Sequence, residues 1–168
     1  MKTKVFVGMG IIMLAAILVL VGCTQKKQVP PPSKEFGVSN VVFCSQEPAG
    51  YMNYKEQPNA TYKPGDTVWI YMNVDNIKYN PNEDGTNEVW ISEYLTLKDP
   101  NGKVLLDQEL LNDHSNLPKK LDPNTLFLRN RIFTTKNLVE GKYTVYITVT
   151  DKLANKTASV SSNFYLKK

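Results

Sequence analysis

Few residues of this chain could carry acid–base or nucleophilic chemistry. His114 is the only histidine in the 168 residues, so a metal site with several histidine ligands is excluded. A Ser–His–Asp triad would have to use His114, which lies in the polar stretch 112–115, and no Gly-x-Ser-x-Gly motif is present. No pair of carboxylates stands out. We therefore predict that the protein is not an enzyme, has no catalytic residues and no cofactor, and carries His114 as a solvated loop residue.

The stretch 80–85 places oxygen-bearing side chains at alternate positions ahead of Gly85, as Asn80, Asn82 and Asp84. This spacing resembles the opening of an EF-hand calcium loop. The position that should supply a bidentate glutamate is Ile91, which departs from that family. A different calcium site remains conceivable, using Asp75, Asn82, Asp84 and Glu88. A solvated turn accounts for the same composition, and we predict no metal site.

Exposed aromatic side chains are the stronger candidates for binding. In the stretch 88–98, apolar residues alternate so that one face is buried, which turns Trp90 and Tyr94 outward. The same parity turns Tyr146 outward in the stretch 143–150. Aromatic rings offer large apolar area at low entropic cost, so these three residues are the predicted ligand-binding residues. Trp69 and Tyr71 form a second predicted outward pair. A slip of one residue in strand register would reverse these assignments.

The elements that position these side chains are strands and turns, because no stretch after residue 36 keeps a helical period. Asp99-Pro100-Asn101-Gly102-Lys103 is a hairpin signal. Residues 76–87 are predicted as a long loop, and residues 112–124 as irregular. Seven strands result, which is the number in an immunoglobulin-like antiparallel β-sandwich, and in that arrangement the third, sixth and seventh strands share a sheet. The predicted strands are 38–45, 67–75, 88–98, 104–111, 126–134, 143–150 and 157–166.

Two groups of motifs carry a resemblance to known sandwich domains. Gly141-Lys142-Tyr143-Thr144-Val145 is similar to the entry of the penultimate strand of immunoglobulin-like domains, where a tyrosine bonds back across a corner. Val145 stands where antibody domains have cysteine. The stretch 141–151 also resembles the end of polycystic-kidney-disease-type repeats, and the turns at 62–68 and 99–103 resemble those of macroglobulin-like domains. The resemblance implies a fold, but no particular activity.

The N-terminal residues have the pattern of an export signal. Lys2 and Lys4 precede the apolar run 5–21, which ends in Leu20-Val21-Gly22-Cys23. This quartet resembles the lipobox of prokaryotic lipoproteins, which implies cleavage before Cys23 and acylation of its thiol. An uncleaved membrane-anchor helix is the alternative, and either places the body on the extracytoplasmic side of the cell membrane. The predicted organisation is a signal peptide (1–22), a lipidated, proline-containing disordered tether (23–35) and the sandwich domain (36–168).

Composition limits the partners. Removing the leader leaves 18 basic and 16 acidic side chains, and so balanced a body argues against nucleic acid as a partner. Cys44, in an apolar run, is predicted to be a small buried side chain. We predict a lipid-anchored, non-catalytic binding module that contacts a protein partner or an envelope component. The alternatives are a carbohydrate-binding module using Trp90, Tyr94 and Tyr146, and an extracellular protease inhibitor that presents an apical loop.

Overall fold

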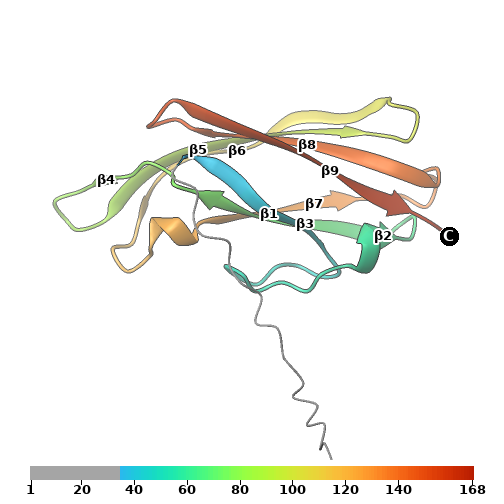
Figure 1. The fold of residues 1–168 in the computed structure, drawn as a ribbon, viewed down its shortest axis with the longest axis horizontal. Helices are drawn as coiled ribbons and strands as arrows, with labels where there is room; N and C mark the ends of the chain where they lie inside the picture. The colour runs from blue at the N-terminus through green and yellow to red at the C-terminus, as the bar shows by residue number, and fades with distance from the viewer. Residues whose placement is uncertain (1–34) are drawn as a thin grey trace, which may run out of the picture. The chain divides into compact units, whose positions relative to one another are not determined.

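The structure is a computed structural model, and it describes residues 35–168 (Figure 1). The predicted signal peptide, Cys23 and nearly all of the tether lie outside the described residues. Within residues 35–168, no helix is long and apolar enough to cross a membrane.

The described residues form an all-β domain of two sheets, without an α-helix among them. The small sheet has three strands in the order β1 (Gly37–Cys44), β3 (Thr67–Asp75) and β7 (Phe127–Phe133). The large sheet has six strands. Its order is β2-β9-β8-β5-β4, and β6 also pairs with β5. The bounds of its strands are β2 (Thr61–Tyr62), β4 (Asn80–Pro81), β5 (Asn87–Lys98), β6 (Val104–Leu117), β8 (Gly141–Asp151) and β9 (Lys156–Leu166).

The core lies between the two sheets, which form the lower and upper layers in Figure 1. Every second side chain of β3 and β8 points into this core, because successive residues of a strand point to opposite faces. The buried side chains of β3 in the small sheet face those of β5, β8 and β9 in the large sheet. The inward set includes Val68, Ile70, Met72, Val74, Val89, Ile91, Leu95, Leu97, Val145, Ile147, Val149, Phe164 and Leu166.

Six of the seven longer strands of the described part match their predicted ranges to within two residues at either end, and the seventh, β6, begins where predicted. Gly102 adopts a positive φ of 82° in the predicted hairpin turn. Cys44 is fully buried, as expected. Two predictions of irregular structure were wrong. Strand β6 continues to Leu117 instead of ending at residue 111, and the stretch 76–87 contains β4, which pairs with the start of β5.

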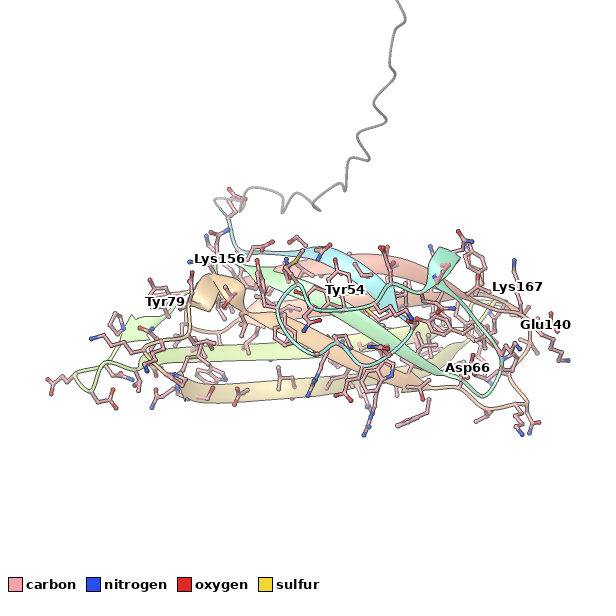
Figure 2. All side chains as sticks on the ribbon, turned by 90° about the horizontal axis from the view of Figure 1, so that it is seen from below. Tyr54, Asp66, Tyr79, Glu140, Lys156 and Lys167 are labelled. Atoms are coloured by element: carbon pink, nitrogen blue, oxygen red, sulfur yellow. The ribbon has the colours of Figure 1, made fainter. Side chains whose placement is uncertain are left out.

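The predicted outward pair Trp69 and Tyr71 is not exposed in the way that strand parity indicated. Tyr71 is completely buried and Trp69 is half-buried, because the connection after β1 folds back over the outer face of β3. Figure 2 shows the segment that carries Tyr54 crossing this sheet. The ring of Tyr54 lies 4.5 Å from that of Tyr71, and the Tyr71 hydroxyl accepts a hydrogen bond from the Met52 backbone N–H. A second, smaller apolar cluster therefore covers the small sheet.

The entry to β8 contains the corner interaction that its sequence predicted. Tyr143 is completely buried, and its hydroxyl donates a 2.8 Å hydrogen bond to the carbonyl oxygen of Val139. Gly141 makes the close packing at this corner possible, since it has a φ of 141° and a Cβ there would lie 2.7 Å from Cγ of Pro100. The β5–β6 hairpin turn and the start of β8 are thus locked together.

Replacing Tyr143 with phenylalanine should lower the free energy of unfolding by about 1 kcal/mol, because the hydrogen bond to the Val139 carbonyl is lost while the packing of the ring is kept. Urea denaturation followed by circular dichroism measures this change. Tyr146→Phe is the matched control, and its exposed hydroxyl should change stability by less than about 0.5 kcal/mol. Equal stability of wild type and Tyr143→Phe would contradict the corner's contribution.

Candidate functional site

The three predicted binding residues lie on the outer surface of the large sheet. Trp90 and Tyr94 belong to β5, and Tyr146 belongs to β8. Their exposed fractions are 37%, 43% and 43%, while their chain neighbours Val89, Leu95 and Val145 are buried. We call the surface formed by Trp90, Tyr94 and Tyr146 the aromatic face. Their role in binding stays a prediction, whereas their shared sheet and outward direction are structural facts.

Strand register sets the spacing of the rings. Tyr94 pairs with Thr148, and Tyr146 pairs with Thr96, so the two tyrosines are diagonal neighbours across β5 and β8. Diagonal partners in an antiparallel pair lie about 7–8 Å apart. Trp90 lies four residues before Tyr94 on the same strand, a distance of roughly 13 Å. The rings therefore follow a line that crosses the sheet obliquely.

Trp90 is held in position by two residues of the neighbouring strand β6. Its ring stacks on that of His114, with ring centroids 4.7 Å apart and an angle of 14° between the planes. The indole Nε1 donates to Oδ1 of Asn112 at 3.1 Å. Nε2 of His114 in turn lies 2.8 Å from Oε1 of Glu88. Hydrogen bonds from Asn80 and then from His114 hold the pKa of the Glu88 carboxyl below its ordinary value.

The prediction that His114 is a loop residue was wrong. His114 lies in β6, because that strand extends further than its polar sequence indicates. Its side chain remains solvated, with about half of its surface exposed. It contacts a tryptophan and a carboxylate. No hydrogen bond joins it to a hydroxyl nucleophile among the described residues.

The surface around Tyr94 and Tyr146 is polar. Outward hydroxyls form cross-strand pairs between β8 and β9, such as Thr148 with Ser159 at 3.0 Å and Thr150 with Thr157 at 3.1 Å. A depression of about 410 Å³ beside Tyr146 is lined by Thr148, Ser159 and Ser161, among others. The ammonium group of Lys98 stands 5.1 Å from the Tyr146 ring centroid. The pKa of Tyr94 is raised, first by desolvation and then by the Asp107 carboxylate.

One aromatic residue of the same surface was missed by the sequence analysis. Tyr165 on β9 is 37% exposed and lies between the buried Phe164 and Leu166. It pairs with Lys142, four residues before Tyr146 on β8, so it extends the oblique line of rings. The alternation of Phe164 and Leu166 was a readable signal that Tyr165 points outward.

The loop that resembled a calcium site uses its oxygens internally. Oδ1 of Asp84 accepts hydrogen bonds from the backbone N–H and the hydroxyl of Thr86. Asn80 donates to Glu88, and Gly85 takes a positive φ of 80°. Within the described part of the chain, no group of three or more His, Cys, Asp or Glu side chains is placed to hold a metal ion. The geometry is that of a hydrogen-bonded Asx turn between β4 and β5.

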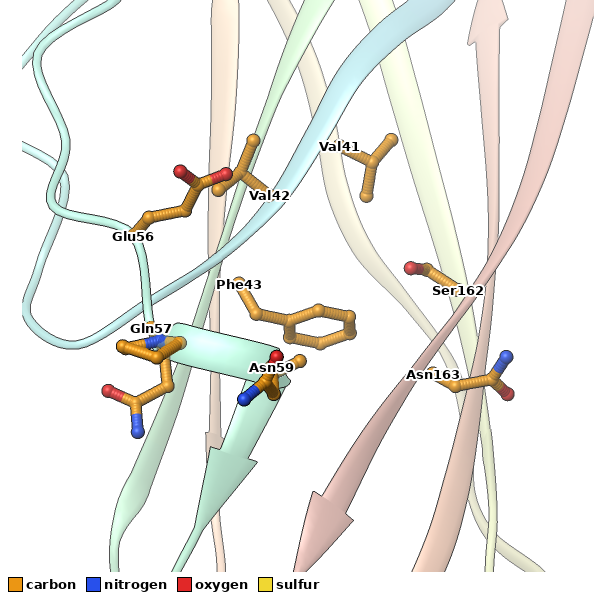
Figure 3. Close-up of a pocket in the computed structure, with 10 residues that line it drawn as sticks. Val41, Val42, Phe43, Glu56, Gln57, Asn59, Ser162 and Asn163 are labelled. Atoms are coloured by element: carbon orange, nitrogen blue, oxygen red, sulfur yellow. The ribbon is translucent and has the colours of Figure 1, made fainter.

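A pocket of about 460 Å³ opens on the side of the domain where β1 faces β9 (Figure 3). The ring of Phe43 lies between the two strands, and Asn59, Ser162 and Asn163 contribute polar groups. Glu56 is the one ionisable side chain among the described residues that line it. The pocket offers no pair of groups for acid–base chemistry.

A buried acidic residue lies between the sheets. Glu93 of β5 is 2% exposed, and its Oε1 accepts a hydrogen bond from Nδ2 of Asn130 on β7. Burial raises the pKa of the Glu93 carboxyl, and the bond from Asn130 lowers it by less. Sequence analysis passed over this residue, although Glu93 has the same strand parity as the inward Ile91 and Leu95.

Comparisons with known proteins give no family for this chain. No family model matches it, and no curated protein sequence does. Its fold has distant likenesses among solved structures. One is the alkylpurine DNA glycosylase AlkC of Pseudomonas fluorescens bound to DNA containing an abasic site analog (8% identity, TM-score 0.41), which covers 80% of this chain. This chain spans about a third of that protein, 31% of its length.

Two further likenesses are of the same kind. Superoxide reductase (neelaredoxin) from Ignicoccus hospitalis is 12% identical with a TM-score of 0.39, over 77% of this chain and 82% of that one. The sporulation control protein Spo0M of Bacillus subtilis is 7% identical with a TM-score of 0.35, over 79% of this chain and 49% of that one. Similarities this distant carry no information about function.

The raised pKa of Glu93 predicts a pH dependence of stability. The native carboxyl binds its proton more tightly than the unfolded one, so stability should fall as the pH rises above the ordinary glutamate range, until the native carboxyl ionises too. Glu93→Gln keeps the volume and removes the charge. Thermal melts between pH 4 and 8 should show a falling Tm for wild type relative to Glu93→Gln. Parallel curves for the two proteins would contradict a raised pKa.

Proposed function

We propose that this protein is a lipid-anchored, non-catalytic binding module on the extracytoplasmic side of the cell membrane, and that its aromatic face binds a polysaccharide of the cell envelope. The location rests on the lipobox-like sequence that ends in Cys23. The contact surface rests on the line of exposed rings, Trp90, Tyr94 and Tyr146.

We also propose that the domain is immunoglobulin-like. The strand order supports this. Counting only the seven long strands, the first, second and fifth (β1, β3 and β7) form one sheet, and the third, sixth and seventh (β5, β8 and β9) lie together in the other, as in immunoglobulin-like domains. The Tyr143–Val139 hydrogen bond also supports it. The fourth long strand, β6, pairs with β5 in the sheet of β8 and β9, whereas constant-type immunoglobulin domains place that strand in the opposite sheet.

The observation that carries the choice of ligand is the composition of the aromatic face. Beside the rings, the outward side chains of β5 and β8 include Thr96, Thr148 and Thr150, and the face holds hydroxyls, amides and carboxylates where a typical protein interface has an apolar centre. Rings can pack on the apolar faces of sugars while these polar groups bond to sugar hydroxyls. Asn112 and Asp107 lie beside Trp90 and Tyr94 and could contribute such bonds.

A protein partner is the second candidate for this surface. Exposed tryptophan and tyrosine are typical centres of protein interfaces, and His114 already holds the Trp90 ring in one orientation. A protease inhibitor acting through an apical loop is the third. Substitutions on the aromatic face should weaken binding of a polysaccharide or a protein partner but leave a loop-mediated inhibitor active. They therefore distinguish the first two functions from the third.

Substituting Trp90 with alanine should weaken binding of the purified protein to insoluble envelope polysaccharide about tenfold, because a central aromatic contact is worth more than 1 kcal/mol. Co-sedimentation at increasing polysaccharide concentration measures the affinity. Tyr94→Ala and Tyr146→Ala should weaken it as well. Phe133→Ala is the matched control, since Phe133 is 66% exposed but belongs to the small sheet. Retention of full affinity by Trp90→Ala would refute the polysaccharide proposal.

Cys23→Ser should abolish lipid attachment and block normal maturation, because the thiol is the acylation site in the lipobox family. Metabolic labelling with a fatty-acid analogue, followed by mass spectrometry of the mature N-terminus, provides the measurement. Cys44→Ser is the control and should still be labelled. Mature wild-type protein that still carried residues 1–22 would show that the segment is an anchor and not a cleaved signal.

A further inference from the structure

Two edge strands lie side by side along one flank of the domain. β6 pairs with β5 alone, and β7 pairs with β3 alone, so each has one edge without a partner strand among the described residues. They belong to different sheets, and the space between them opens to solvent. We call this opening the β6–β7 seam. It is separate from the aromatic face, and the inference below does not rest on the proposed function.

The free edge of β6 lacks three of the common protections against pairing. Exposed edges in soluble proteins are commonly blocked by lysine or proline, or are kept short. β6 is 14 residues long and contains no lysine, arginine or proline. Its charged side chains are acidic, as Asp107, Glu109 and Asp113, apart from the ionisable His114. The edge therefore offers backbone hydrogen-bonding groups and negative charge to an incoming chain.

The seam contains two adjoining pockets that share one wall residue. The first, of about 510 Å³, is apolar and is lined by Leu97, Leu105 and Phe133, among others. The second, of about 520 Å³, is lined by Leu111, Leu128 and Asn130, among others. Leu110 lines both pockets. It is the extra residue of a β-bulge, since Glu93 pairs with Leu111 and Tyr94 pairs with Glu109.

Glu93 gives the second pocket its chemistry. Glu93 is only 2% exposed, and it lines the pocket together with Asn130. Oε1 accepts from Asn130, whereas Oε2 has no hydrogen-bond partner among the described residues. The two arginines of β7 that line the pockets are engaged elsewhere. Arg129 is bound to Glu47 and to the carbonyl of Pro48, and the Arg131 guanidinium lies over the ring of Phe133. A cationic group on an apolar stem would fit between the leucines and reach Oε2.

We propose that the β6–β7 seam binds an extended polypeptide segment of a partner protein, which adds a strand to the free edge of β6. The segment places a lysine side chain against Glu93 and an apolar side chain in the pocket of Leu105 and Phe133. Main-chain pairing supplies the affinity, and the two pockets supply the selectivity.

The spacing of the two pockets defines the sequence pattern of the segment. The apolar pocket is lined by Leu95 and Leu97, which follow Glu93 by two and four positions on β5. Side chains on one face of an extended strand repeat about every 6.8 Å, which is two residues. The bound segment therefore carries its apolar residues two and four positions from the lysine, on the same face.

A second copy of this chain fits the seam less well. Symmetric pairing of β6 with β6 would bring Asp107, Glu109 and Asp113 of one copy against the same residues of the other. Like charges placed directly opposite across strands are destabilising. The acidic edge instead favours a basic partner segment, and it would also speed the encounter with it.

The test uses the full-length protein in detergent and two fluorescent nine-residue peptides. The first peptide is a threonine chain with lysine at the third position and isoleucine at the fifth and seventh. The second has norleucine in place of lysine, which keeps the stem and removes the charge. Fluorescence anisotropy should show at least tenfold tighter binding of the lysine peptide to wild type. Glu93→Gln should abolish that preference, and Leu110→Arg should weaken both peptides.

Hydrogen–deuterium exchange locates the contact. The lysine peptide should slow exchange of backbone amides within 104–117, and Tyr146→Ala, a change on β8 of the aromatic face, should bind it as well as wild type does. Absence of saturable binding up to about 1 mM peptide, equal preference in wild type and Glu93→Gln, or protection outside β6 and β7 would each overturn the proposal. Peptide-free dimers with β6 already protected would assign the seam to a second copy instead.

Discussion

The unequal width of the two sheets is the constraint on which the rest of this structure depends. Strands in a sheet are about 4.8 Å apart, so the three strands of the small sheet cannot cover the four long strands β9, β8, β5 and β6 of the large one. One strand, β6, is left overhanging. Its inward side chains face the edge of β7 instead of the centre of a sheet, and this leaves the opening that holds Glu93. The outer face of the small sheet is covered by the connection after β1, which buries Tyr71.

Strand parity made much of this fold predictable from sequence. In β8, every second residue is apolar and the strand lies inside a sheet, so alternation reports burial directly. The outward direction of Trp90, Tyr94 and Tyr146 followed from the same rule, because no segment within residues 35–168 covers these rings. The Asn-Gly turn at 101–102 fixed the β5–β6 hairpin. Such local signals suffice where one face of a strand meets the core and the other meets water.

The errors arose where contacts between distant parts of the chain decide the structure. Parity placed Tyr71 outside, but Tyr54 and Met52 cover it from a connection whose path no local pattern reveals. Residues 112–116 are polar because β6 is an edge strand with little core contact, so this part of the strand carries no apolar alternation to detect. Glu93 occupied an inward position, but a charged residue in an apolar series looks like an interruption until its partner Asn130 on another strand is known.

The position of β1 has a mechanical consequence. The chain enters the described domain at the edge strand β1, which pairs with β3 alone. A pull on the residues before Gly37, directed along the strand, would load the β1–β3 hydrogen bonds in shear, so that they would resist together instead of opening one after another. The aromatic face lies on the other sheet, so tension between the residues before Gly37 and the aromatic face would have to pass through the apolar core. Phe43, which packs its ring against that of Phe164 at 5.7 Å, is one of the contacts that would transmit it.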